Sequence, residues 1–205
     1  MLRWLERWRV VAVQDAYRTM PWADVVYGSD LKWWRTQDGC PGFSGARWST
    51  HSLGDHVDDK REAAERWGVQ LVQGEDGKGF STNPGVIHYG SNSGYQAIQV
   101  ALHKGCKRIV LVGYDMRHVD GKAHFFGDHP QGLHTNTDAQ FRNYAQFFAK
   151  AAKLLPADVS IVNATPGSAL TCFPMMTLED AIASDIRFGD GGLHWDRAFA
   201  NDATG

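Results

Sequence analysis

The sequence lacks the features that mark several specialised classes of protein. No run approaches the roughly 18 consecutive apolar residues of a transmembrane helix, and the net charge of -2 shows no basic excess of the kind that binds a nucleic-acid backbone. Cysteine is scarce, and Cys40, Cys106 and Cys172 form no CxxC pair, which indicates reduced thiols in a cytoplasmic compartment. Residues 1–8 are amphipathic and charged, unlike a signal peptide.

The remaining composition is that of one ordinary globular domain. A chain of 205 residues with 43% hydrophobic and 21% charged residues can bury one sizeable core. Tryptophan is abundant, and its concentration in the first fifty residues predicts a large aromatic core. We expect a single domain over residues 1–184 and a loosely ordered tail over the polar, glycine-rich residues 185–205.

Alternating apolar runs and helical patterns predict the fold class. Strands are expected at 9–13, 23–27, 69–72, 108–113 and 159–163, with a further short one near 46–48. Helices are expected at 31–35, 58–67, 93–103, 137–155 and 178–183. This alternation is typical of an α/β protein with a mostly parallel sheet and helices on both faces.

Ligands of such sheets bind beyond the carboxyl ends of the strands. Small or polar residues follow the expected strands there: Gln14, Asp15, Ser29, Asp30, Tyr114, Asp115, Asn163, Thr165 and Ser168. A glycine-rich stretch, 74–85, is expected to be a loop. The sequence therefore predicts a polar site at one edge of the sheet.

The segment Gly90-Ser91-Asn92-Ser93-Gly94 opens the helix expected at 93–103. Backbone N–H groups at a helix N-terminus can bind a phosphate, and the flanking glycines permit close approach. Plain helix capping by the same small polar residues is an equally good interpretation. The segment is neither a Walker A loop nor GxGxxG, which disfavours a P-loop kinase and an ordinary NAD enzyme.

A polar loop at 116–136 contains four of the nine histidines: His118, His124, His129 and His134. Histidine is the usual general base at neutral pH, so this loop is a candidate for catalysis. The spacings of 6, 5 and 5 residues match no helical HxxxH metal pair. A solvated loop without a function is the remaining alternative.

The segments Gly90-Ser91-Asn92-Ser93-Gly94 and Gly105-Cys106-Lys107-Arg108-Ile109-Val110-Leu111-Val112-Gly113-Tyr114-Asp115 resemble a known superfamily. It unites bacterial sialyltransferases that use CMP-sialic acid, motility accessory factors of flagellin glycosylation and the archaeal 6-hydroxymethylpterin diphosphokinase. The likeness is greatest to uncharacterised phage and prophage proteins, which share segments such as 124–130 and 165–168, and it covers about residues 9–183. It implies a Rossmann-like three-layer α/β/α fold.

The resemblance also implies roles for individual residues. In the sialyltransferases the loop that opens the helix contacts the nucleotide sugar, which carries over to Gly90, Ser91, Asn92, Ser93 and Gly94. A histidine before an Asn-Thr-Asp triplet is the general base there. Since Asn136-Thr137-Asp138 follows His134, the resemblance implies His134 as the base, with His129 second. Those enzymes need no metal and stabilise the leaving phosphate with tyrosine hydroxyls, a role that would fall to Tyr114.

Two departures from the superfamily stand near the N-terminus. Its members begin with a strand and a Gly-x-Gly-Pro-Ser-like loop, and neither precedes Arg9 in this sequence. An asparagine that usually follows the second strand is here Gln14. A missing first strand would leave a sheet edge or a gap beside residues 10–13.

The sequence thus predicts a glycosyltransferase that is encoded by a phage or prophage. Its donor would be a nucleotide-activated sugar, with a CMP-linked sugar as one option, and its acceptor is unknown. No cofactor or metal is expected for that reaction, and a nucleic acid would enter only as the acceptor. An ATP-dependent diphosphokinase, which would require Mg²⁺, is the first alternative. A non-catalytic phage module that binds a nucleotide or a protein is the second. A cytoplasmic location fits all three.

Overall fold

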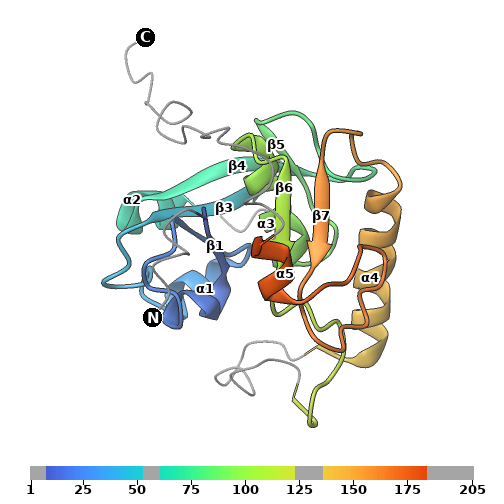
Figure 1. Ribbon diagram of the computed structural model, residues 1–205. Coiled ribbons are helices and arrows are strands. Elements are labelled where there is room, and N and C mark those ends of the chain that lie inside the picture. Colours follow the sequence, from blue (N-terminus) through green and yellow to red (C-terminus); the bar gives the residue numbers. More distant parts are fainter. Residues whose placement is uncertain (1–7, 53–60, 123–135, 184–205) are drawn as a thin grey trace.

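The computed structural model describes residues 8–52, 61–122 and 136–183 (Figure 1). The expected tail at 185–205 and the candidate bases His129 and His134 lie outside the described residues. Within the described part, no helix is both long and apolar enough to span a membrane. The three cysteines all fall inside it and are free thiols.

Five parallel strands form the main sheet in the order in which they occur along the chain. They are β1 (Val11–Val13), β2 (Val25–Tyr27), β3 (Ala46–Ser52), β4 (Val69–Glu75) and β5 (Val86–His88). Strand β5 was not expected from the sequence, because its two apolar residues directly follow the glycine-rich stretch 74–85 and form no longer apolar run. Two further strands, β6 (Arg108–Leu111) and β7 (Ser160–Asn163), pair in parallel as a second sheet.

Helices connect most of the strands at the positions that the sequence indicates. They are the 3-10 helix η2 (Gln14–Arg18) and the α-helices α1 (Leu31–Thr36), α2 (Arg61–Trp67), α3 (Ser93–His103), α4 (Asp138–Ala152) and α5 (Leu178–Ala183). Local chemistry sets two of the starts. The Asn92 side chain accepts a hydrogen bond from the Tyr95 amide at α3, and Thr137 and Gln140 form a capping box at α4.

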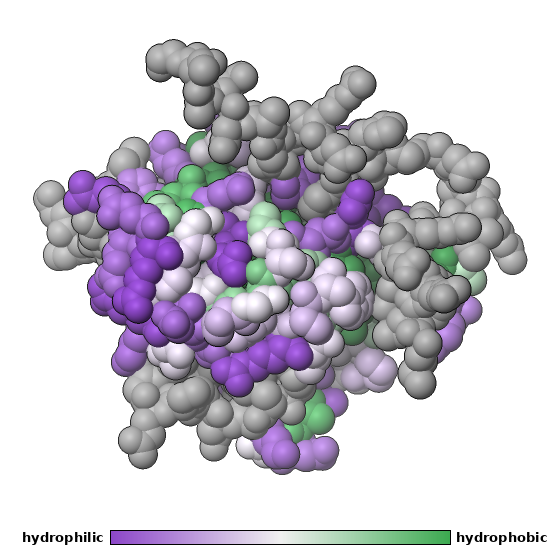
Figure 2. Space-filling view, turned by 90° about the vertical axis from the view of Figure 1, so that its left-hand side faces the viewer, coloured by the Kyte–Doolittle hydropathy of each residue, from purple (hydrophilic) through white to green (hydrophobic). Residues whose placement is uncertain are grey.

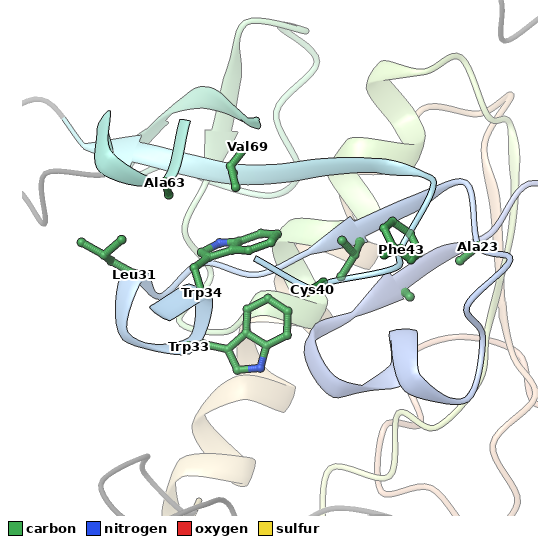
Figure 3. Packing of buried hydrophobic residues seen from close by; sticks show 10 residues of the cluster. Ala23, Leu31, Trp33, Trp34, Cys40, Phe43, Ala63 and Val69 are labelled. Carbon is green, nitrogen blue, oxygen red and sulfur yellow. The ribbon is translucent and has the colours of Figure 1, made fainter. Parts of the chain in front are cut away.

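One face of the five-stranded sheet is covered by α1 and α2. Trp33 and Trp34, which are both fully buried, pack there in an edge-to-face pair with ring centroids 4.9 Å apart, next to Cys40 and Phe43 (Figure 3). The predicted aromatic core is therefore present. It does not include every tryptophan, since Trp22 is 46% exposed.

The other face of the sheet curls around α3. This helix contacts both β1 and β5, although these strands form opposite edges of the sheet. Its Ala97 and Val100 pack with Tyr27 from β2 and Trp48 from β3. Helices thus lie on both faces of an all-parallel sheet, which confirms the predicted Rossmann-like α/β/α fold.

The opposite side of α3 belongs to a second core. Tyr95 and Ile98 of α3 pack there with Phe148 of α4, Leu111 of β6 and Ile161 of β7. The rings of Tyr95 and Phe148 meet edge-on at 5.3 Å. Helix α3 therefore holds the two sheets together.

The carboxyl ends of both sheets meet the start of α3. Tyr27, the last residue of β2, donates a hydrogen bond of 2.6 Å to Gln96 in the first turn of α3. Tyr114, just after β6, donates one of 3.0 Å to the carbonyl of Gly94. The exits of β2 and β6, one from each sheet, thus both reach the start of α3. Strand β1 is an edge strand among the described residues.

Candidate functional site

The start of α3 lies at the centre of the polar edge. The first intrahelical bond of α3 runs from the Gln96 amide to the Asn92 carbonyl. The amides of Ser93 and Gly94 lie before it and therefore have no carbonyl partner within the helix. The hydroxyls of Ser29 and Ser93 lie 2.8 Å apart and join the end of β2 to the helix. This end of the helix carries the positive end of the peptide dipole, so it favours an anion.

Gln14 and Asp30 lie together at the neighbouring strand exits. The Gln14 amide nitrogen is 3.5 Å from a carboxylate oxygen of Asp30, which is exposed. Asp30 is the N-cap residue of α1, but its side chain makes no capping bond. Burial and, to a smaller extent, the negative charge of Asp30 raise the pKa of Tyr144 on α4. Tyr144 therefore lies near enough to Asp30 for the carboxylate charge to affect it.

Asp15 does not join this group. Its carboxylate is buried and accepts hydrogen bonds from the Trp33 indole at 3.0 Å and from the Gln37 amide at 3.2 Å. Arg18 lies 3.4 Å from the same carboxylate. Arg18 belongs to η2, and Trp33 and Gln37 belong to α1 and its C-cap, so Asp15 ties η2 to α1.

The exits of β6 and β7 build one interlocked turn. The Thr165 hydroxyl accepts from the Tyr114 amide, and the Ser168 hydroxyl donates to the Tyr114 carbonyl. The Asn163 amide donates to the Ser168 hydroxyl at 3.0 Å, and the Asp115 carbonyl accepts from the chain at residue 169. These groups satisfy one another, so they act as a scaffold that holds the Tyr114 hydroxyl against α3. Burial raises the pKa of that hydroxyl above its ordinary value.

Three of the six non-glycine residues with positive φ in the described part of the chain lie near these exits, and the others are Asp38, Cys40 and Asp120. Gln14 directly follows β1 with φ 47°, Ser91 precedes α3 with φ 64°, and Met116 follows β6 with φ 50°. Such conformations cost an L-residue about 1–3 kcal/mol each and collect at functional sites. Their presence at neighbouring strand exits supports the location of the site.

His118 forms a pair that the sequence did not reveal. Its Nδ1 is 2.6 Å from a carboxylate oxygen of Asp138, the first residue of α4. Twenty residues separate the two, and no local pattern signals contact over such a distance. Tyr144 was also missed, because no local pattern signals that it lies near Asp30. Its hydroxyl donates to the Asn136 side chain at 3.1 Å, so α4 connects the Asp30 region with the His118 region.

In the part of the chain that the structure describes, no group of three or more His, Cys, Asp or Glu side chains is placed to hold a metal ion. No family model matches the chain, and comparisons with curated proteins and with solved structures find no match either. The resemblance to the sialyltransferase superfamily therefore stays a prediction.

Proposed function

We propose that the protein binds a nucleotide-activated sugar at the carboxyl edge of its strands and transfers the sugar to a hydroxyl group. The observation that carries this proposal is the convergence of two strand exits on the start of α3. Ser29, Ser93 and the amide of Gly94 gather where a phosphate is favoured by the helix dipole. Asp30 follows Ser29 in the chain and contacts Gln14, and both side chains can bind sugar or ribose hydroxyls.

The chemistry of the proposal is a displacement at the anomeric carbon. A general base takes the proton of the acceptor hydroxyl, the hydroxyl oxygen forms the new bond, and the nucleotide leaves with the electron pair of the broken C–O bond. The resemblance assigns the base to His134, or secondarily to His129. A phage or prophage origin and a cytoplasmic location belong to the same proposal.

One observation favours a second candidate, a non-catalytic nucleotide-binding or protein-binding module. The Tyr114 hydroxyl, which the resemblance assigns to the leaving phosphate, donates to the Gly94 carbonyl instead. In this candidate the edge binds a nucleotide without turning it over.

Calorimetric titration of the full chain with CMP, UDP, GDP and adenine nucleotides tests the proposal. We expect one pyrimidine or guanine nucleotide to bind, and we expect a chelator to leave its affinity unchanged. Binding of ATP alone, and only with Mg²⁺, would favour the diphosphokinase. Binding of none would contradict every nucleotide-dependent candidate.

A further inference from the structure

The imidazole of His118 is held by two residues on one face of α4. Its Nδ1 lies 2.6 Å from the Asp138 carboxylate, and its ring meets the Phe141 ring edge-on at 5.3 Å and 81°. The backbone next to it is also fixed, because the Arg117 guanidinium donates to the Gly167 carbonyl at 2.7 Å. His118 is therefore positioned by the fold, although it lies in a long loop.

The other ring nitrogen of His118 is directed away from these contacts. A carboxylate only accepts hydrogen bonds, so the neutral ring must carry its proton on Nδ1 and its lone pair on Nε2. Within the described residues, Nε2 has no hydrogen-bond partner, and the side chain keeps 31% of its surface exposed.

The positions of contacts along α4 relate the His118–Asp138 pair to the start of α3. Phe148 packs against Tyr95, in the first turn of α3, and against Tyr114. Phe141, next to His118, is seven residues earlier on α4, which corresponds to about 10 Å of helix. Tyr144 lies between the two positions on α4, and the Asp30 charge contributes to raising its pKa. A donor bound with its phosphate at α3 would have to span about this distance for its anomeric carbon to come near His118.

We propose that His118 is the general base of the proposed transfer and that Asp138 orients it, which makes a neutral hydroxyl the acceptor. Nε2 takes the proton of that hydroxyl as its oxygen attacks the anomeric carbon. The C–O bond to the nucleotide phosphate breaks, and its electron pair leaves with the phosphate. The Asp138 carboxylate stabilises the imidazolium that forms. This inference rests on the proposed function, since it needs the donor at α3.

The test combines an NMR measurement of the His118 tautomer, which needs no substrate, with a measurement of turnover. Long-range ¹H–¹⁵N NMR of the full chain above pH 8 should show His118 as the Nδ1–H tautomer. Asp138→Asn should remove that preference, whereas Asp158→Asn should not. Asp158 is exposed, pairs with Lys107 at 2.9 Å and precedes β7 at the amino ends of the strands. The substitution Asp158→Asn therefore removes the same charge far from the site. An Nε2–H tautomer in the wild type would overturn the proposal.

For turnover, the release of free nucleotide is followed with CMP-, UDP- and GDP-activated sugars, with water as the acceptor. We expect His118→Ala to lower the rate at least about 100-fold, while calorimetry shows unchanged binding of the free nucleotide. Unchanged release in His118→Ala together with loss in His134→Ala would assign the base to His134 and overturn the inference while the proposed function stands. Absence of nucleotide binding in the wild type would overturn both.

Discussion

At the scale of single residues, Gly90 is the position where the loop before α3 depends most on its residue type. Its φ is +51°, and a Cβ atom built on it would lie 2.0 Å from the Tyr95 ring. Gly90→Ala should therefore lower the free energy of unfolding by about 2–4 kcal/mol, from backbone strain and from the clash together. Urea denaturation measures this loss.

Gly105 provides the matched control for that substitution. It also has a positive φ, +85°, but a Cβ atom there would meet nothing within 4 Å. Gly105→Ala should cost only the strain, about 1 kcal/mol. Equal losses in the two variants would show that the contact between Gly90 and the Tyr95 ring does not constrain the loop.

A second residue-scale prediction concerns His103 at the end of α3. Burial lowers the pKa of this imidazole below 6.5, and the nearby His88 lowers it further. The unfolded chain therefore binds the proton more readily than the folded one. Stability should be retained above pH 6.5 and should fall as the pH drops below it.

Replacing His103 with glutamine isolates this contribution. Glutamine can still donate to the Ser81 carbonyl, which the imidazole contacts at 3.1 Å, but it does not titrate. The unfolding free energy of His103→Gln, measured between pH 7.5 and 5.5, should change less than that of the wild type. Identical slopes would mean that His103 does not contribute to acid sensitivity.

At the scale of secondary-structure elements, Gln99 ties α3 to the short edge strand β5. Its side-chain oxygen accepts from the amides of Ser81 and His88, and its amide group donates to the His88 carbonyl at 2.8 Å. Gln99→Met keeps the size of the side chain but leaves these buried backbone groups without partners. We expect a loss of at least about 3 kcal/mol in urea denaturation.

Gln70→Met is the control for that variant, because Gln70 is exposed on β4. It should change stability by no more than about 0.5 kcal/mol. A similarly small effect of Gln99→Met would show that apolar packing alone holds β5 against α3.

The sequence predicts most elements where a local signal is strong. The helix expected at 137–155 from its apolar spacing is observed as α4 (Asp138–Ala152), and α5 has the expected bounds of 178–183. Strand β5 has no such signal, because it depends on pairing with β4 and on the buried Gln99. The candidate site shows the same difference between residues with a local sequence signal and residues that depend on long-range contacts. Ser29 and Ser93 were predicted from strand exits and capping, but the pairing of His118 with Asp138 depends on how α4 folds back over the loop.

At the scale of the whole molecule, α3 is shared by two of the three hydrophobic cores. Its Val100 belongs to the core inside the curled sheet, and its Ile98 belongs to the core with α4, β6 and β7. On the face that Figure 2 shows, hydrophobic residues form only small separate areas among hydrophilic ones. Two cores that share one helix should unfold together.

Tryptophan fluorescence of a Trp195→Phe variant can test this cooperativity, because the described tryptophans all lie before residue 68, on the side of the five-stranded sheet. Unfolding in urea followed by this fluorescence should coincide with unfolding followed by far-ultraviolet circular dichroism, which also reports α4. Two separated transitions would show that the cores are independent.

The most direct test of the central claim compares two serine substitutions that add the same charge at opposite ends of the strands. Ser91 is exposed beside the start of α3 and has a positive φ that aspartate tolerates, and Ser160 is exposed at the amino end of β7. If a phosphate binds at α3, calorimetry with the preferred nucleotide should show at least about tenfold weaker binding for Ser91→Asp, which corresponds to about 1.4 kcal/mol, and no change for Ser160→Asp. Equal affinities in the two variants would contradict a phosphate site at the start of α3.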